Sequence, residues 1–212
     1  MFSSNKKIYF RDFVFCVWEN VYEPAEDSFL FAENLIVNEG EVVLDMGTGC
    51  GILGIIAVEK ASAIVAMDIN PYAVRCAKEN ARLNNVLGRM VFIQGDLFRS
   101  LKPKEKFDII LFNAPYLPSS KVHRESWLER AWSGGSSGRH VIDRFIREVP
   151  IYLRKNGRVL LLQSTLCNAD KTIQKFRESG MNATVIAERD LPFFESLILF
   201  EAKFDRSNTK LN

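Results

Sequence analysis

Alternation of short apolar strands with helical stretches is the feature that most constrains the fold of this chain. From residue 41 onward, strand-like runs such as 63–68 and 107–113 are separated by segments with helical periodicity, for example 70–84. Crossover helices of this kind join parallel strands and cover both faces of their sheet. The pattern predicts an α/β domain over residues 41–204, and a chain of 212 residues can bury one core of that size.

The two ends of the chain depart from this alternation. The late strands 183–187 and 197–202 have no crossover helix between them, so they are expected to pair antiparallel as a hairpin. Residues 1–40 are predicted to form an N-terminal extension of the same domain with short strands, and residues 205–212 a polar tail. The short strands are expected at 8–10 and 13–17, the remaining strands at 42–45, 89–94 and 158–163, and the remaining helices at 51–60, 140–153 and 168–179.

The composition excludes several classes of ligand and partner. The formal charge of +2 comes from acids and bases scattered along the sequence, so no basic patch for nucleic acid stands out. The four cysteines are widely spaced, and with only two histidines there is no zinc-ligand pattern, so no metal site is expected. No segment approaches the roughly 20 apolar residues that span a bilayer. We expect a cytoplasmic protein that acts on a small molecule or a protein.

Each of the first three strands predicted from residue 41 onward ends in an acid or is closely followed by one: Asp45, Asp68 and Asp96. Any one of them would more often be a helix cap or turn residue, but parallel strands bring all three to one edge of the sheet, where open α/β folds bind ligands. Asp68 lies 23 positions beyond Asp45, near the offset at which an acid accepts from ribose hydroxyls. Ile69 is then placed to cover an adenine face, and Asp96, beside Leu97, to accept from the adenine amino group.

A glycine turn follows the first strand in the register Asp45-x-Gly47-x-Gly49-x-Gly51. In the dinucleotide fingerprint GxGxxG, the turn amides meet a pyrophosphate and the third glycine lets helix and strand approach. Here an acid precedes the first glycine, a register that differs from that fingerprint. A dinucleotide site and a tight turn without a ligand are the alternatives.

The fourth strand runs into Asn113-Ala114-Pro115-Tyr116, a turn that can hold a planar amide or amine. An amide nitrogen is a poor nucleophile, so a site that methylates it should bind its N–H groups with acceptors. The Asn113 side-chain oxygen and the Ala114 carbonyl suit that role, Pro115 fixes the turn, and Tyr116 can stack on the planar group. The alternative is that Asn113 caps a loop and Tyr116 fills the core.

At these residues the chain resembles the S-adenosylmethionine-dependent protein-glutamine N5-methyltransferases that modify the Gly-Gly-Gln motif of translation release factors, and in particular their short archaeal and eukaryotic HemK-like branch. The resemblance spans about residues 21–204 and implies a seven-stranded Rossmann-like class I methyltransferase fold with a C-terminal antiparallel hairpin. Its motifs are Val21-Tyr-Glu-Pro-Ala-Glu-Asp27, the glycine turn, Asn113–Tyr116, 131–139 and 143–145.

The resemblance also implies roles for residues and partners. The Glu-Pro-Ala-Glu-Asp segment borders S-adenosylmethionine, Asp45 meets the ammonium group of this cofactor, and the glycine-rich loop within 132–139 supports the substrate side. A release factor is the implied protein substrate, and a small zinc-binding activator subunit, or a second copy of this chain, is expected at the edge strand 89–94. The expected cofactor-binding residues are Glu26, Asp27, Ser28, Asp45, Gly47, Gly49, Gly51, Asp68, Ile69, Asp96, Leu97 and Asn113.

One departure from the family concerns Ala114, where the usual motif is Asn-Pro-Pro-Tyr. With alanine in place of proline the unfolded chain is less restricted, which lowers the stability by about 0.4–1 kcal/mol. A proline at 114 should be tolerated provided that the Ala114 N–H makes no needed hydrogen bond. Two other functions stay open: an adenine-N6 methyltransferase acting on flipped bases of DNA or RNA, although no target-recognition domain fits the length, and a non-catalytic cofactor-binding scaffold.

Overall fold

The computed structural model describes residues 4–119 and 126–205, so most of the predicted tail lies outside the described residues. The strands are β1 (Ser4–Phe10), β2 (Phe13–Trp18), β3 (Val42–Met46), β4 (Ala63–Asp68), β5 (Met90–Gln94), β6 (Phe107–Asn113), β7 (Leu153–Ser164), β8 (Met181–Leu191) and β9 (Glu195–Phe204). The helices are α1 (Glu26–Glu33), α2 (Ile52–Ala57), α3 (Pro71–Leu83), α4 (Trp127–Trp132), α5 (His140–Tyr152) and α6 (Ala169–Glu178).

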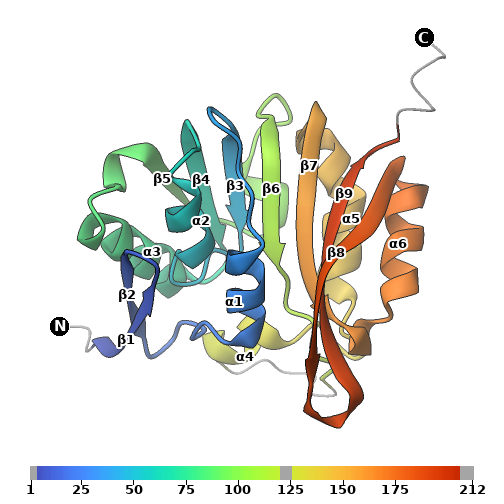
Figure 1. Cartoon of the computed structure of the whole chain (residues 1–212), viewed down its shortest axis with the longest axis horizontal. Helices are drawn as coiled ribbons and strands as arrows, with labels where there is room; N and C mark the ends of the chain where they lie inside the picture. The colour runs from blue at the N-terminus through green and yellow to red at the C-terminus, as the bar shows by residue number, and fades with distance from the viewer. Residues whose placement is uncertain (1–3, 120–125, 206–212) are drawn as a thin grey trace.

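A seven-stranded sheet of order β5-β4-β3-β6-β7-β9-β8 forms the centre of the domain (Figure 1). Strands β3 to β7 are parallel, and β9 is antiparallel to both β7 and β8. The predicted Rossmann-like α/β fold and its C-terminal hairpin are confirmed. Because β3, β4 and β6 are parallel neighbours, the residues that follow them meet at one edge of the sheet.

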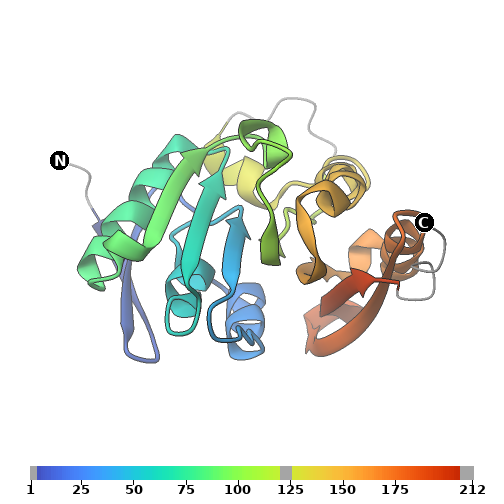
Figure 2. The ribbon, with the colours of Figure 1, turned by 90° about the horizontal axis from the view of Figure 1, so that it is seen from above.

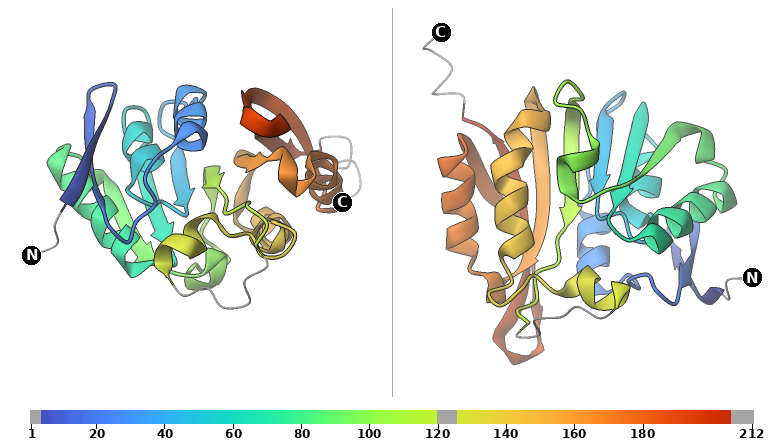
Figure 3. Two further views of the ribbon diagram at one scale, coloured as in Figure 1. Left: turned by 90° about the horizontal axis from the view of Figure 1, so that it is seen from below. Right: turned by 180° about the vertical axis from the view of Figure 1, so that it is seen from behind.

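Helices cover both faces of the sheet, as seen along it in Figure 2. Side chains of α1, α2 and α3 build one apolar core, and those of α5 and α6 build the other. Figure 3 shows α5 and α6 together on the face behind the sheet. Near-continuous apolar strands such as β6 are therefore buried from both sides, as expected for parallel sheets.

The N-terminal strands β1 and β2 pair as a separate antiparallel hairpin packed against α3. Asn80 of α3 holds this contact: its side-chain oxygen accepts from the Cys16 amide at 2.8 Å, and its NH₂ group donates to the carbonyls of Cys16 and Cys50 at 3.0 and 2.8 Å. Cys50 belongs to the glycine turn. The N-terminal extension thus stabilises the turn through one buried amide.

Helix α3 begins as its sequence indicates, since the Asn70 side chain accepts from the Tyr72 amide and Pro71 takes the first helical position. Two helices were not predicted. Helix α1 includes the end of the 21–27 motif, and α4 lies within the connection 114–139. Both are short, at 8 and 6 residues, and therefore carry little periodic signal.

Strands β7 and β8 are longer than predicted, at 12 and 11 residues. In β8 the added residues pair with β9 although they lack an apolar alternation. In β7 the added stretch starts at Leu153, which pairs with Phe107, and the pairing resumes at Arg158 after a register shift. No helix in the described part of the chain is long and apolar enough to cross a membrane.

Candidate active site

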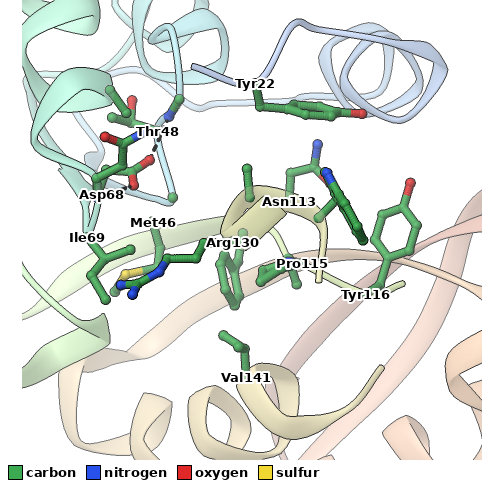
Figure 4. A pocket seen from close by; sticks show the side chains of 18 of the residues that line it. Tyr22, Met46, Thr48, Asp68, Ile69, Asn113, Pro115, Tyr116, Arg130 and Val141 are labelled. Atoms are coloured by element: carbon green, nitrogen blue, oxygen red, sulfur yellow. Dashed lines mark hydrogen bonds between the residues drawn. The ribbon is translucent and has the colours of Figure 1, made fainter. Parts of the chain in front are cut away.

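A cavity of about 880 Å³ opens at the carboxyl ends of β3, β4 and β6, and Figure 4 shows its side chains. Its size is in the range of small-molecule and cofactor sites. Twelve of the predicted residues line it, namely Asp27, Ser28, Gly47, Gly49, Asp68, Ile69, Asp96, Leu97, Asn113, Ala114, Pro115 and Tyr116. The structure therefore brings these twelve residues together at one edge of the sheet.

The glycine turn is held open by Asp68 at the end of β4. Its two carboxylate oxygens accept from the backbone amides of Gly49 at 3.0 Å and Asn70 at 2.9 Å. Burial raises the pKa of Asp68, and these bonds to the ionised form oppose the rise. Gly47 has a φ of +68°, and a Cβ there would lie 3.3 Å from the Phe112 ring. The turn can approach β6 only because this residue is glycine.

Three predicted cofactor residues, Glu26, Asp45 and Gly51, are not among the residues that line the cavity. Glu26 is exposed and pairs with Arg189 at 2.9 Å. Gly51 precedes α2 with a φ of +91°, and a Cβ there would lie 3.1 Å from that of Ala77, so this glycine serves close helix packing.

Asp45 lies beneath the turn and is 1% exposed. Its carboxylate accepts from the Thr48 hydroxyl at 2.6 Å and the Gly54 amide at 3.0 Å. Burial raises the pKa of Asp45 to about 6. In this structure the residue shapes the turn from below, and its expected contact with an ammonium group stays a prediction.

Asp96 lines the cavity but already has cationic partners. Its Oδ2 atom lies 2.8 Å from Arg144 and 3.2 Å from Arg99. Arg144 of α5 also lines the cavity, beside Ile69 and Leu97. The predicted acceptor role of Asp96 toward an adenine amino group stays a prediction, and Arg144 now fixes the orientation of the carboxylate.

The side chain of Asn113 has one satisfied end and one free end. Its NH₂ group donates to Asp27 Oδ2 at 3.1 Å and lies 3.3 Å from Ser28 Oγ. Since a carboxylate only accepts, the NH₂ group must face Asp27. The Oδ1 atom of Asn113 is buried and is the only such side-chain oxygen or nitrogen without a hydrogen-bond partner in the described residues. A buried unpaired acceptor is costly, which indicates that a ligand donor normally meets it.

Asp27 is the centre of this hydrogen-bond network. The Tyr22 hydroxyl lies 3.1 Å from both carboxylate oxygens, and the Tyr116 hydroxyl donates to Oδ2 at 3.4 Å. Burial, together with the Asp27 charge, raises the pKa of both tyrosines, so both stay protonated donors. Sequence reasoning placed Asp27 at the cofactor and missed Tyr22, although Tyr22 lies in the 21–27 motif.

The backbone of the Asn113–Tyr116 turn makes two hydrogen bonds, one to the backbone of β7 and one to a side chain in the segment after it. The Ala114 amide donates to the Leu162 carbonyl at 3.3 Å. A proline at 114 was expected to be tolerated if the Ala114 N–H made no needed hydrogen bond, and this condition is not met. The Tyr116 carbonyl accepts from Cys167 Sγ at 2.6 Å. The predicted stacking of the Tyr116 ring on a substrate stays a prediction.

The glycine-rich loop packs directly onto the chain that follows this turn. The Gly134 amide donates to the Leu117 carbonyl at 2.9 Å. A Cβ at Gly138 would lie 2.3 Å from the Tyr116 carbonyl oxygen, and one at Gly134 would lie 2.2 Å from the Gly138 oxygen. Only glycine permits this approach at Gly134 and Gly138.

One wall of the cavity contains none of the predicted site residues. It comes from α4 and the start of α5 and consists of Trp127, Arg130, Ala131, Trp132, His140, Val141 and Arg144. The signals for this wall were the length of the connection and the motifs 131–139 and 143–145, which contain Ala131, Trp132 and Arg144. Arg130 stacks over the Trp127 ring at 4.8 Å.

These features fit a nucleoside cofactor such as S-adenosylmethionine. Asp68 and Asp96 supply acceptors, Ile69 and Leu97 supply apolar surface, and the turn at Gly47–Gly49 leaves room for close approach. Asn113 and Tyr116 lie beyond them in the same cavity, where a second ligand would be held.

Comparison with known proteins identifies methyltransferase relatives of this chain. The family model of ribosomal protein L11 methyltransferase (PrmA) matches residues 28–114. A putative protein N5-glutamine methyltransferase of Methanocaldococcus jannaschii is 46% identical, over 84% of this chain and 90% of that protein. The methyltransferase HEMK2 of Homo sapiens is 33% identical, over 81% of this chain and 85% of that protein.

Solved structures support the fold. The E. cuniculi Mtq2-Trm112 complex, responsible for methylation of the eRF1 translation termination factor, contains a chain that superposes with a TM-score of 0.64 at 22% identity, covering 88% of this chain and 99% of that chain. The M. jannaschii tRNA m1G37 methyltransferase superposes with a TM-score of 0.69 at 21% identity, over 94% of this chain and 56% of that one. At these identities the likeness concerns the fold.

Proposed function

The chain belongs to the protein N5-glutamine methyltransferase family, and from this premise we propose that it methylates the side-chain amide of the glutamine in the Gly-Gly-Gln motif of a translation release factor. S-adenosylmethionine is the proposed methyl donor. When bound, it supplies a methyl group already activated on a sulfonium. The residues of the chain then have to position the amide and exclude water.

The observation that carries this proposal is the buried, unpartnered Oδ1 of Asn113. A glutamine side-chain amide offers two N–H donors. Asn113 Oδ1 is placed to accept from one of them, and the Ala114 carbonyl is proposed to accept from the other. Both bonds draw electron density toward the amide nitrogen and orient its lone pair, which resonance otherwise disperses into the carbonyl. Asp27 and Ser28 keep the Asn113 amide in the orientation that this task needs.

Removal of the proton takes place late in such a reaction, because an amide nitrogen becomes acidic only once it carries the new methyl group. The tyrosine hydroxyls at Asp27 have pKa values raised above the ordinary value. They are therefore hydrogen-bond donors that hold Asp27, and are unsuited to act as bases at neutral pH.

Adenine-N6 methylation is the second candidate, since the same turn can hold an exocyclic amine. It has less support, because the relative with 46% identity is named for protein glutamine methylation. The name of the relative with 33% identity, methyltransferase HEMK2, does not distinguish the two activities. The scaffold alternative has less support still, because these relatives are named as enzymes.

Radiolabelled methyl transfer tests the proposal. The purified chain is incubated with labelled S-adenosylmethionine and a release factor, its Gln→Ala variant in the Gly-Gly-Gln motif, or DNA and RNA. Label is expected in the wild-type factor alone. Asn113→Ala should lower kcat by about 10²-fold, since it removes one positioned acceptor, with cofactor affinity changed much less. Asn182→Ala, at an exposed position on β8, is the matched control. Transfer to nucleic acid and not to the factor would refute the proposal.

We further infer an activator subunit at β5, the edge strand opposite β8. Within the described residues β5 pairs only with β4, it carries no charge, and Val91 is 57% exposed. Such an edge is poorly protected against strand addition. The small zinc-binding protein expected from the resemblance is the proposed partner.

The solution mass of the chain, alone and mixed with that partner, tests this part. Val91→Lys should abolish the complex, while the same change at Val185, 47% exposed on the other edge, should leave it intact. Phe92 is a poorer choice, because it packs partly on the core. A monomer that ignores the partner would show that β5 is not an interface.

A further inference from the structure

Two aromatic rings project into solvent at the turn between β8 and β9. Phe193 and Phe194, in the 3₁₀ segment η4 (Pro192–Phe194), are 96% and 105% exposed, more than any other large hydrophobic side chain among residues 4–119 and 126–205. Aromatic rings bury roughly 150–250 Å² each when they are covered. The pair is therefore comparable to the largest apolar patch on a typical monomer, which is often functional.

The backbone of this turn holds both rings outward. Phe193 and Phe194 have φ angles of +65° and +62°, in the left-handed region that aromatic residues rarely adopt. Both sides of the hairpin base are anchored. Arg189 pairs with Glu26 and Glu33 of α1 at 2.9 and 2.6 Å, and the Ser196 amide donates to Thr165 Oγ1 at 3.0 Å. The rings are thus presented on a fixed support.

The turn adjoins the substrate end of the cavity. Glu195, next to Phe194, is close enough to Tyr116 for its charge to contribute to raising the pKa of that tyrosine. Leu166, 53% exposed, lies in the segment η3 (Thr165–Cys167), whose Cys167 binds the Tyr116 carbonyl. Figure 1 shows the hairpin extending past the sheet at the end where α1 and α4 lie.

We propose that Phe193, Phe194 and Leu166 form a docking surface for the folded protein that carries the target amide. This inference rests on the proposed function. A single glutamine side chain offers few contacts, so selection of one protein requires recognition outside the cavity. The segments that carry these residues adjoin Tyr116 through Glu195 and Cys167, and rigid aromatic anchors of this kind dominate binding at protein interfaces. Strained backbone is retained where function uses it.

The test is the double variant Phe193→Asn/Phe194→Asn. Asparagine tolerates positive φ, so the turn keeps its shape while both rings are lost. The matched control is Ile36→Asn/Ile151→Asn, whose side chains are 71% and 50% exposed and precede β3 and β7 at the other end of the strands. Steady-state methylation of the full-length release factor is measured, together with calorimetric titration of S-adenosylhomocysteine.

We expect KM for the factor to rise by at least about 30-fold, as for loss of a binding hot spot, with kcat and cofactor affinity unchanged and the control like wild type. An unchanged KM would overturn the docking surface while leaving the proposed function intact. A wild-type enzyme that does not methylate the factor would overturn both. Sedimentation showing a dimer that the variant dissociates would assign the surface to a second copy of this chain and overturn the inference.

Discussion

Replacing Asp45 by Asn should flatten the pH dependence of stability. Asp45 is 1% exposed, and burial raises the pKa of its carboxyl from the ordinary 3.8 to about 6, despite hydrogen bonds from Thr48 and Gly54 that favour the ionised form. The folded state thus holds this proton more tightly than the unfolded chain does. The stabilisation is fully present below pH 3.8 and is lost as the pH rises through about 6.

The size of this loss follows from the two pKa values. A rise from 3.8 to about 6 corresponds to about 3 kcal/mol of native-state stability between acidic and neutral pH. The Asn side-chain oxygen can accept the same two hydrogen bonds without ionising. At pH 8, Asp45→Asn is therefore expected to unfold at a higher urea concentration than the wild type, with a free energy of unfolding that is greater by up to about 3 kcal/mol. Near pH 4 the two free energies of unfolding should match.

Urea unfolding of the ligand-free protein at pH 4, 6 and 8, followed by tryptophan fluorescence, measures the difference. The exposed Asp12→Asn serves as control and should track the wild type at every pH. A variant that is less stable than wild type at pH 8, or parallel to it across the range, would refute the reasoning. Weaker cofactor binding by Asp45→Asn would in addition support the predicted role of this carboxylate toward the ammonium group.

Three further changes test the site. Asp68→Ala should weaken cofactor binding by roughly tenfold or more in a calorimetric titration, because the turn and the proposed ribose contact lose a charged acceptor; unchanged affinity would place Asp68 outside the binding site. Ala114→Pro should be neutral to slightly destabilising in thermal melts. It loses the 3.3 Å hydrogen bond to the Leu162 carbonyl, and it gains about 0.4–1 kcal/mol of stability because the unfolded chain has less conformational entropy. A clear gain in Tm would show that this hydrogen bond contributes nothing. Gly138→Ala should lower both stability and turnover, because the added Cβ clashes with the Tyr116 carbonyl. Gly180→Ala has a similar φ but open space around it, so it should lower the free energy of unfolding by only about 1 kcal/mol. Equal effects of the two changes would contradict the close packing of the loop.

The sequence by itself determined the sheet and the edge that carries the cavity. Apolar strands ending in Asp68 and Asp96, an Asn-Pro helix start and a glycine turn are local signals, and parallel topology brings strand ends together whatever the side-chain details. The Asn113–Tyr116 turn was located in the same way, because its residues are consecutive. The C-terminal hairpin followed from the missing crossover helix.

Only the tertiary structure decided how the acids divide their roles. Asp45 lies under the turn and Asp27 takes the centre of the Asn113 network, because burial and hydrogen-bond partners depend on residues far away in sequence. Asp27 and Asn113 are separated by 86 positions and meet at 3.1 Å. The wall from α4 and the outward rings of Phe193 and Phe194 have the same origin: short segments carry no periodicity, and their places are set by the contacts at their ends.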